Sequence, residues 1–134
     1  MMNENVQRAG LLATAHEMAG KGLSAGTSGN VSVRCARGFL IPPPGRAYED
    51  CTPDDMALMA MDGNWQGTFA PSSEWRIHRD IYAAHPEAGA VLHAHSPFAT
   101  ALACHRRRIP AFHYMIARFG GDDIRCAPYA TFGT

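Results

Sequence analysis

The chain has 134 residues, and 46% of them are hydrophobic, which is enough to build the core of one domain and excludes a disordered chain. Its 12 basic and 12 acidic residues give a formal net charge of zero, which argues against a nucleic-acid partner or an anionic membrane partner. No apolar stretch approaches the roughly 20 residues that span a bilayer, and residues 1–8 lack the basic-then-apolar order of a signal peptide.

The first part of the chain predicts one helix followed by a hairpin. Apolar residues recur at helical spacing over Asn5–Lys21, and flanking glycines end that helix. A loop of small residues, Ser24–Asn30, then leads to an alternating strand, Val31–Arg34, with Gly38–Ile41 as its hairpin partner.

After three prolines at positions 42–44, which break the chain, the pattern predicts a helical turn, a strand and a second helix. The turn covers Thr52–Asp55, because threonine is a good cap and proline suits the first helical position. Met56–Met61 predicts a strand that is closed by a turn. A helix over residues 72–85, capped by one of the two serines at its start, follows.

The last third begins with a short apolar run, Ala88–Leu92, which predicts a buried strand that continues through His93–His95. A serine and a proline then open a helix over residues 96–104. Ile109–Ile116 and Ile124–Tyr129 predict strands or extended segments. Helices and strands alternate without strict βαβ regularity, which predicts a mixed α/β layered domain.

The cysteines indicate the compartment. They are widely spread and form no Cys-x-x-Cys pair, which is typical of reduced, mostly buried thiols rather than of a disulfide framework or a zinc ribbon. Together with the N-terminal sequence, they predict a cytoplasmic protein. The residues concerned are Cys35, Cys51, Cys104 and Cys126.

A His-x-His pair, His93 and His95, is the strongest chemical signal in the sequence. Residues two apart on a strand leave the same face, so both imidazoles can bind one metal ion. Glu74, at the start of the preceding helix, is a candidate partner that could ligate the ion or act as a base. Two histidines that are hydrogen-bonded inside the core are the alternative interpretation.

Two groups of small polar residues indicate an anion site. Gly26–Asn30 offers backbone amides and side-chain donors that can form a nest for a phosphate or carboxylate. Ser72 and Ser73 would add hydroxyls at a helix N-terminus. The alternative interpretation is that the first group is an ordinary glycine-rich turn and the second an ordinary serine cap, with no bound anion. Tyr114 could act as an acid toward a leaving oxygen, or it could be a core aromatic residue.

Together, in this order, these motifs resemble the class II aldolase/adducin family, and within it the members that act on L-fuculose 1-phosphate. The resemblance covers nearly the whole chain. It implies an α/β fold, a three-layer α/β/α sandwich with a largely antiparallel central sheet, in a single domain over residues 1–134. It also implies a homotetramer with active sites between subunits. The matching stretches are Gly26–Arg34, Pro71–Arg76, Val91–His95, Ile109–Ala117 and Cys126–Thr134.

The resemblance further implies a zinc-dependent aldolase, a lyase that performs retro-aldol cleavage of a sugar phosphate such as L-fuculose 1-phosphate to dihydroxyacetone phosphate and an aldehyde. His93 and His95 would be ligands of zinc or another divalent metal, and Glu74 would be both a resting-state ligand and the general base. Tyr114 would donate a proton to the aldehyde oxygen. The residues that would bind substrate are Thr27, Ser28, Asn30, Gly45, Ser72, Ser73 and, on the aldehyde side, Phe132.

The sequence departs from the family pattern in two places. The family's third zinc histidine lies in a His-His-Gly stretch that would follow Thr134, so we expect an incomplete domain with weak metal binding and little activity. His113 is the alternative third ligand. Pro44 replaces the usual threonine or serine before Gly45, and proline has neither a hydroxyl nor an amide hydrogen. An epimerase, decarboxylase or dehydratase of the same fold, or a non-catalytic adducin-like module, are therefore the alternatives.

Overall fold

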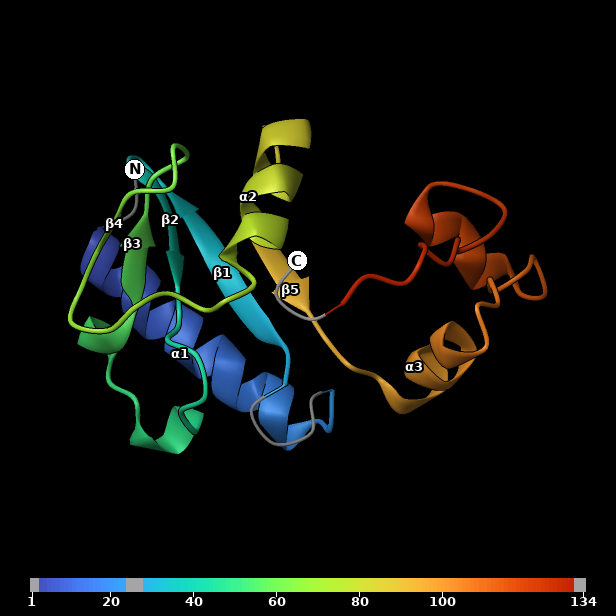
Figure 1. Cartoon of the computed structure of the whole chain (residues 1–134), viewed down its shortest axis with the longest axis horizontal. Helices are drawn as coiled ribbons and strands as arrows, with labels where there is room; N and C mark the ends of the chain where they lie inside the picture. Colours follow the sequence, from blue (N-terminus) through green and yellow to red (C-terminus); the bar gives the residue numbers. More distant parts are fainter. Residues whose placement is uncertain (1–2, 24–27, 132–134) are drawn as a thin grey trace. The chain divides into compact units, whose positions relative to one another are not determined.

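The computed structural model describes residues 3–23 and 28–131. These residues divide into two compact units, one within residues 1–95 and one within residues 96–134. Figure 1 shows the first unit as a sheet with two α-helices and the second as one α-helix followed by loops and a further helical segment. The predicted grouping of both units in one domain stays a prediction.

A five-stranded sheet forms the centre of the first unit (Figure 1). Its strands lie in the order β4-β3-β2-β1-β5, and each pairing is antiparallel. The predicted hairpin is confirmed, whereas the two-residue β4 is too short to show a periodic signal and is not predicted. The strands are β1 (Asn30–Cys35), β2 (Gly38–Ile41), β3 (Ala57–Met59), β4 (Trp65–Gln66) and β5 (Ala90–His93).

Helices α1 (Glu4–Gly20) and α2 (Trp75–Ala84) pack against opposite faces of this sheet. Because successive strand residues alternate between faces, the strands supply one set of apolar side chains to each helix. The predicted α/β/α layering with an antiparallel sheet is therefore confirmed. The cluster on the α1 side contains Leu11, Leu12, Ala15, Met18, Val31, Leu40, Cys51, Met56 and Leu58. The cluster on the α2 side contains Phe39, Ile41, Ala57, Met59, Tyr82 and Val91.

Local capping explains where the first elements begin. The Asn3 side chain accepts a hydrogen bond from the backbone N–H of Asn5 at 2.9 Å, so α1 starts within one residue of the predicted position. The predicted turn is the 3₁₀ helix η2 (Pro53–Asp55). There the Asp55 carboxylate accepts from the backbone N–H of Thr52 at 2.7 Å, which closes a capping box.

Two predicted strands differ from the structure. The strand predicted over Met56–Met61 shortens to β3, because the chain already turns where the backbone N–H of Ala60 donates to the carbonyl of Asn64 at 2.8 Å. The strand predicted from Ala88–Leu92 forms as β5, but the prediction that it is buried is wrong. Since β5 is an edge strand, only Val91 is covered on the α2 side, and Leu92 on the other face is 49% exposed.

The second unit contains α3 (Pro97–Cys104), which begins after Ser96 as predicted. Strands or extended segments are predicted over Ile109–Ile116 and Ile124–Tyr129. Neither stretch forms a strand, because Ile109 and Ile124 form only an isolated bridge and Tyr114–Phe119 form the 3₁₀ helix η3. The His113 side chain favours that helix by accepting from the backbone N–H of Met115 at 3.2 Å.

Two properties hold for the described residues of both units. None of their helices is both long enough and apolar enough to cross a bilayer. The four cysteines are free thiols, but the expectation that they are mostly buried is wrong. Only Cys51 is buried among them, and Cys104 on α3 is exposed.

Candidate metal centre

Three potential metal ligands, Glu74, His93 and His95, meet on the first unit. One ligand atom of each lies within 4.8 Å of the other two. The Oε2 atom of Glu74 and the Nδ1 atom of His93 are 2.8 Å apart, and the centroids of the two imidazole rings are 4.7 Å apart. Glu74 and His93 are half-buried, whereas His95 is exposed. The structure therefore brings together the three side chains that the sequence assigns to one dication.

The strand register positions the histidines. His93 is the last residue of β5 and lies opposite Asn30 of β1. His95 lies beyond the end of the strand, where its backbone N–H donates to the carbonyl of Leu23 at 2.8 Å. This bond ties the segment after β5 to the chain that follows α1, and the two imidazole rings stay adjacent.

Glu74 reaches His93 from the start of α2. We predict a serine cap with Glu74 in the first helical turn, but α2 begins at Trp75 and Glu74 is itself the N-cap residue. The reason is a turn at Ser72, whose hydroxyl accepts from the backbone N–H of Glu74 at 3.3 Å and whose carbonyl accepts from that of Trp75 at 3.0 Å. The helix therefore starts later, with the Glu74 carboxylate at its entrance.

Asn30 and Ser72 lie directly beside the carboxylate. The Nδ2 group of Asn30 donates to the Oε2 atom of Glu74 at 2.7 Å and to the hydroxyl of Ser72 at 3.0 Å. Both residues are buried, with exposed fractions of 6% and 5%. Two of the residues predicted to bind an anion thus share hydrogen bonds with the predicted base, and their binding of an anion stays a prediction.

The other residues predicted to bind substrate are placed less closely or not at all. Ser73 is exposed beside the Ser72 turn, and Ser28 is exposed just before β1. Thr27 and Phe132 lie outside the described residues.

The loop after β2 holds the departure from the family pattern. Pro44 is exposed, and Gly45 follows it with a φ of 67°, a backbone conformation that glycine adopts without strain. A Cβ at Gly45 would meet no atom within 4 Å, so the backbone conformation alone accounts for glycine there.

Tyr114 and His113 belong to the second unit. Tyr114 begins η3 and is 80% exposed, so the alternative of a core aromatic residue is wrong. The His113 ring caps η3 through its Nδ1 atom. The acid role of Tyr114 and the ligand role of His113 stay predictions.

A row of buried polar side chains under the metal ligands is not predicted from the sequence. The Nε2 atom of His78 contacts the Oδ1 atom of Asn30, and the Nδ1 atom of His78 lies 2.7 Å from the hydroxyl of Ser32. That hydroxyl lies 2.8 Å from the hydroxyl of Tyr82. Burial lowers the pKa of His78 to about 4, with His93 adding to the shift, so the ring is neutral.

A signal for this row does exist in the sequence. His78 and Tyr82 are four positions apart, which puts them on one face of a helix, and Ser32 follows Asn30 by two positions on one face of a strand. The signal is weak, because an apolar helix face with a histidine is also the pattern of an ordinary core helix.

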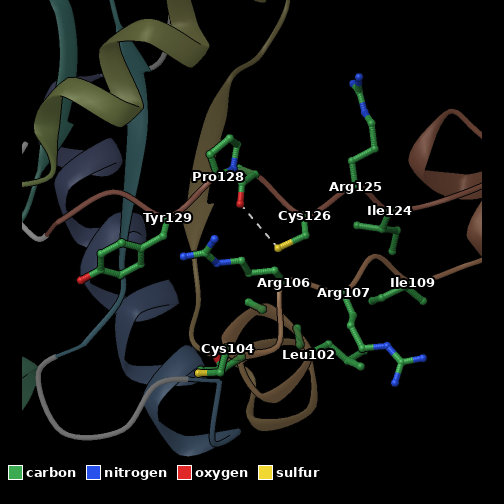
Figure 2. A pocket seen from close by; sticks show the side chains of 14 residues that line it. Leu102, Cys104, Arg106, Arg107, Ile109, Ile124, Arg125, Cys126, Pro128 and Tyr129 are labelled. Carbon is green, nitrogen blue, oxygen red and sulfur yellow. Dashed lines mark hydrogen bonds between the residues drawn. The ribbon is translucent and has the colours of Figure 1, made fainter.

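A hollow of about 670 Å³ lies within the second unit (Figure 2). Figure 2 shows Leu102 and Cys104 of α3 on one side and the bridge residues Ile109 and Ile124 on another. Its lining is mostly apolar, and no described residue that we predict to bind metal or substrate contributes to it. We therefore place the candidate site at the convergent ligands and not at this hollow.

The donor set at Glu74, His93 and His95 fits zinc. Imidazole nitrogens and carboxylate oxygens are ordinary zinc ligands, and catalytic zinc sites combine three protein ligands with an open position. The hydrogen bond from Asn30 orients the Glu74 carboxylate, as partners of metal-binding carboxylates do. The chain therefore presents three candidate zinc ligands together with a residue that orients one of them.

Comparison with known proteins gives a consistent result. Residues 9–134 match the family model described as the Class II Aldolase and Adducin N-terminal domain. The 5-methylthioribulose-1-phosphate/5-deoxyribulose-1-phosphate aldolase of Rhodospirillum rubrum is 52% identical over 127 residues, which cover 95% of this chain and 58% of that protein. The L-fuculose phosphate aldolase of Escherichia coli strain K12 is 46% identical over 133 residues, which cover 99% of this chain and 62% of that protein.

Comparison of the fold with solved structures finds proteins of the same family. The solved structure of an L-fuculose 1-phosphate aldolase matches with a TM-score of 0.88 at 37% identity, covering 96% of this chain and 61% of that chain. The chain thus spans about three fifths of the length of the relatives that it matches.

Proposed function

The chain belongs to the class II aldolase and adducin family, and we propose that it carries the metal centre of a zinc-dependent aldolase that cleaves a ketose 1-phosphate. The observation that carries this proposal is the convergence of Glu74, His93 and His95, whose ligand atoms lie within 4.8 Å of one another. Two imidazoles and a carboxylate suit metal-assisted chemistry on a carbonyl compound. Two of its relatives are named as aldolases of sugar phosphates.

A bound zinc ion would polarise the substrate carbonyl and stabilise the negative charge that develops on its oxygens. In the direction of bond formation, the Glu74 carboxylate takes a proton from the carbon next to the carbonyl of dihydroxyacetone phosphate, which leaves an enediolate. Tyr114 gives its phenolic proton to the aldehyde oxygen as the new C–C bond forms.

Cleavage follows the same steps in reverse. The Tyr114 oxygen takes the proton of the substrate hydroxyl, the electron pair of the breaking C–C bond enters the enediolate, and Glu74 returns a proton to its carbon. Glu74 is therefore the proton carrier at carbon, and Tyr114 is the proton carrier at oxygen.

The phosphate is proposed to bind beside Asn30 and Ser72. Since both side chains are already hydrogen-bonded to Glu74 or to each other, an anion bound there shares the donors that orient the base. Pro44 adds no hydroxyl to this group, so its phosphate contacts are fewer. The remaining proposed substrate residues are Thr27, Ser28, Gly45, Ser73 and, toward the aldehyde, Phe132.

L-Fuculose 1-phosphate is the first candidate substrate. A 5-deoxy- or 5-methylthioribulose 1-phosphate is the second, favoured by the relative that is 52% identical. Each would release dihydroxyacetone phosphate, and only the aldehyde product would differ. The whole protein is proposed to act as a cytoplasmic homotetramer in which both units belong to one domain.

The experiment measures release of dihydroxyacetone phosphate by the whole protein from each candidate substrate, before and after chelation and with zinc restored. We expect Glu74→Gln to lower the rate by about 10²–10⁴-fold, because the amide cannot carry a proton. Glu87→Gln is the matched control, since Glu87 is an exposed carboxylate of the same unit.

Three results would contradict the proposal. They are full activity of Glu74→Gln, activity that survives chelation, and products other than dihydroxyacetone phosphate. The last would support an epimerase, decarboxylase or dehydratase instead, and a whole protein that binds no zinc would support a non-catalytic adducin-like module.

A further inference from the structure

A continuous row of hydrogen bonds runs from the proposed base into the core of the first unit. It passes from Glu74 to Asn30, then to His78 and Ser32, and it ends at Tyr82. We propose that His78 is a positioning residue that holds the Asn30 amide with its N–H groups toward Glu74, and so sets the carboxylate for the metal. This role depends on the metal centre proposed above.

The direction of the row follows from the carboxylate at its end. An ionised carboxylate only accepts hydrogen bonds, so the nitrogen of the Asn30 amide must face Glu74, 2.7 Å away. The amide oxygen of Asn30 then faces His78 and must accept, so the Nε2 atom of His78 carries a proton.

The deeper half of the row has the same direction. Because His78 is neutral, its Nδ1 atom has no proton and accepts from the hydroxyl of Ser32 at 2.7 Å. The oxygen of Ser32 in turn accepts from the hydroxyl of Tyr82 at 2.8 Å. Each donor thus points toward Glu74, and one arrangement of protons satisfies the whole row.

Among the residues that the structure describes, only His78 and Glu74 select the orientation of the Asn30 amide. The oxygen and nitrogen of an amide have nearly the same size, so packing does not distinguish the two orientations. Ser72 does not distinguish them either, because a hydroxyl can donate or accept. Without the N–H of His78, the amide can turn its oxygen toward Glu74, which removes the hydrogen bond and sets two acceptors against each other.

The row is also rigid. Ser32 and His78 have no exposed surface, and Tyr82 is 1% exposed. The guanidinium of Arg34 lies 4.5 Å from the centre of the Tyr82 ring and donates to its backbone carbonyl at 2.9 Å. Helix α2 is therefore fixed to β1 at the far end of the row, and a fixed support keeps ligand geometry within narrow limits.

The first test reads the tautomer of His78 by ¹⁵N NMR in the unaltered chain without metal. We expect a neutral ring with its proton on Nε2 between about pH 5 and 8, where an ordinary histidine changes charge. A ring whose only proton is on Nδ1 would overturn the proposal, because its Nε2 atom could not donate to Asn30. This measurement needs neither zinc nor activity, so it is independent of the proposed function.

The second test measures the affinity for zinc alone by competition with a chelator. His78→Phe keeps a ring and removes the N–H, and we expect it to weaken zinc binding by about 10- to 100-fold. His78→Gln returns an N–H donor at the level of Nε2, and we expect it to recover most of the affinity. His85→Phe is the matched control, because His85 is an exposed histidine of the same unit that lies outside the row, and it should leave zinc binding nearly unchanged.

Native zinc affinity in folded His78→Phe, or equal losses in His78→Phe and His78→Gln, would overturn the positioning role. If His78→Phe does not fold by circular dichroism, the tautomer and the affinity of His78→Gln decide. If the unaltered whole protein binds no zinc, the proposed function fails, and the tautomer still decides the orientation of the row.

Discussion

The two units differ in what holds them together. The first buries two apolar clusters on opposite faces of a hydrogen-bonded sheet. In the described part of the second, Ile116 is the one buried hydrophobic residue, whereas Phe98, Phe112 and Tyr129 are 87%, 73% and 77% exposed. Segments of about 40 residues rarely stay folded on apolar burial alone. The described residues of the second unit therefore bury little apolar surface among themselves.

This difference separates two kinds of functional residue. Glu74 and His93 stand on elements that a core fixes, with neighbours that orient them. Tyr114 stands on a short helix and is 80% exposed. The first unit alone can thus arrange the candidate metal ligands, whereas the proposed proton donor is not held by a core of its own.

Replacing one phenylalanine of each unit by alanine should give the largest difference in stability between the two units. Phe39 has no exposed surface and packs on Tyr82, so Phe39→Ala should lower the free energy of unfolding by about 3–5 kcal/mol. Phe98→Ala, at an exposed ring, should change it by less than about 0.5 kcal/mol. Urea denaturation followed by circular dichroism measures both, and equal losses would show that the second unit buries Phe98 in solution.

Acid should weaken the first unit through His78. The unfolded chain protonates this histidine near pH 6.5, whereas the folded protein keeps it neutral down to a pKa of about 4. The unfolded state therefore binds more protons between these values, so stability is complete above the window and falls as pH drops through it. The total loss is about 3 kcal/mol, at about 1.4 kcal/mol per pH unit.

Unfolding in urea at steps of pH measures this slope. His78→Gln removes the source of this slope and leaves the neighbouring Glu74 and His93 in place, so the variant should lose less stability on acidification. An identical slope in the variant would assign the acid sensitivity to other groups.

Zinc should stabilise one unit and not the other. At a free concentration a hundredfold above the dissociation constant, a ligand that binds only the folded state adds about 2.7 kcal/mol to the free energy of unfolding. Hydrogen exchange should show the added protection in β1, β5 and α2, and chelation should remove it. Protection that appears only in α3 would place the metal elsewhere.

Removing one helix-capping side chain in each unit should give the smallest difference in stability. The Asp55 carboxylate accepts two hydrogen bonds from Thr52, so Asp55→Ala should cost about 1 kcal/mol. Ser96 precedes α3 without a side-chain capping bond, so Ser96→Ala should cost less than about 0.5 kcal/mol. Thermal unfolding of both variants checks this order, and a reversed order would contradict it.

The elements that the sequence predicts well depend on nearby residues. The cap at Asn3, the alternation of the β1–β2 hairpin and the proline in η2 act within a few positions. The burial of β5 is not predictable in this way, because it depends on the order of strands in the sheet. Around Ile109 and Ile124 the sequence does not distinguish a strand from an extended segment, because the same apolar patterns also occur in chain that forms only a bridge.

The candidate site divides in the same manner. His93, His95 and Glu74 can be identified as candidate metal ligands from the sequence alone, because their residue types and spacing are typical of such ligands. The role of His78 cannot be predicted in this way, because it depends on a contact with Asn30. Asn30 lies 48 positions earlier in the chain and reaches His78 only in the folded structure. A buried histidine becomes interpretable once its partners are known.

The register of β1 against β5 has one last consequence. Asn30 pairs with His93 and Ser32 with Val91, so a slip of one residue would turn the partnered side chains to the wrong side of the sheet at the same moment. Zinc should therefore bind only after β1 and β5 have paired in this register, and the rate of zinc binding during refolding would report when the two strands align.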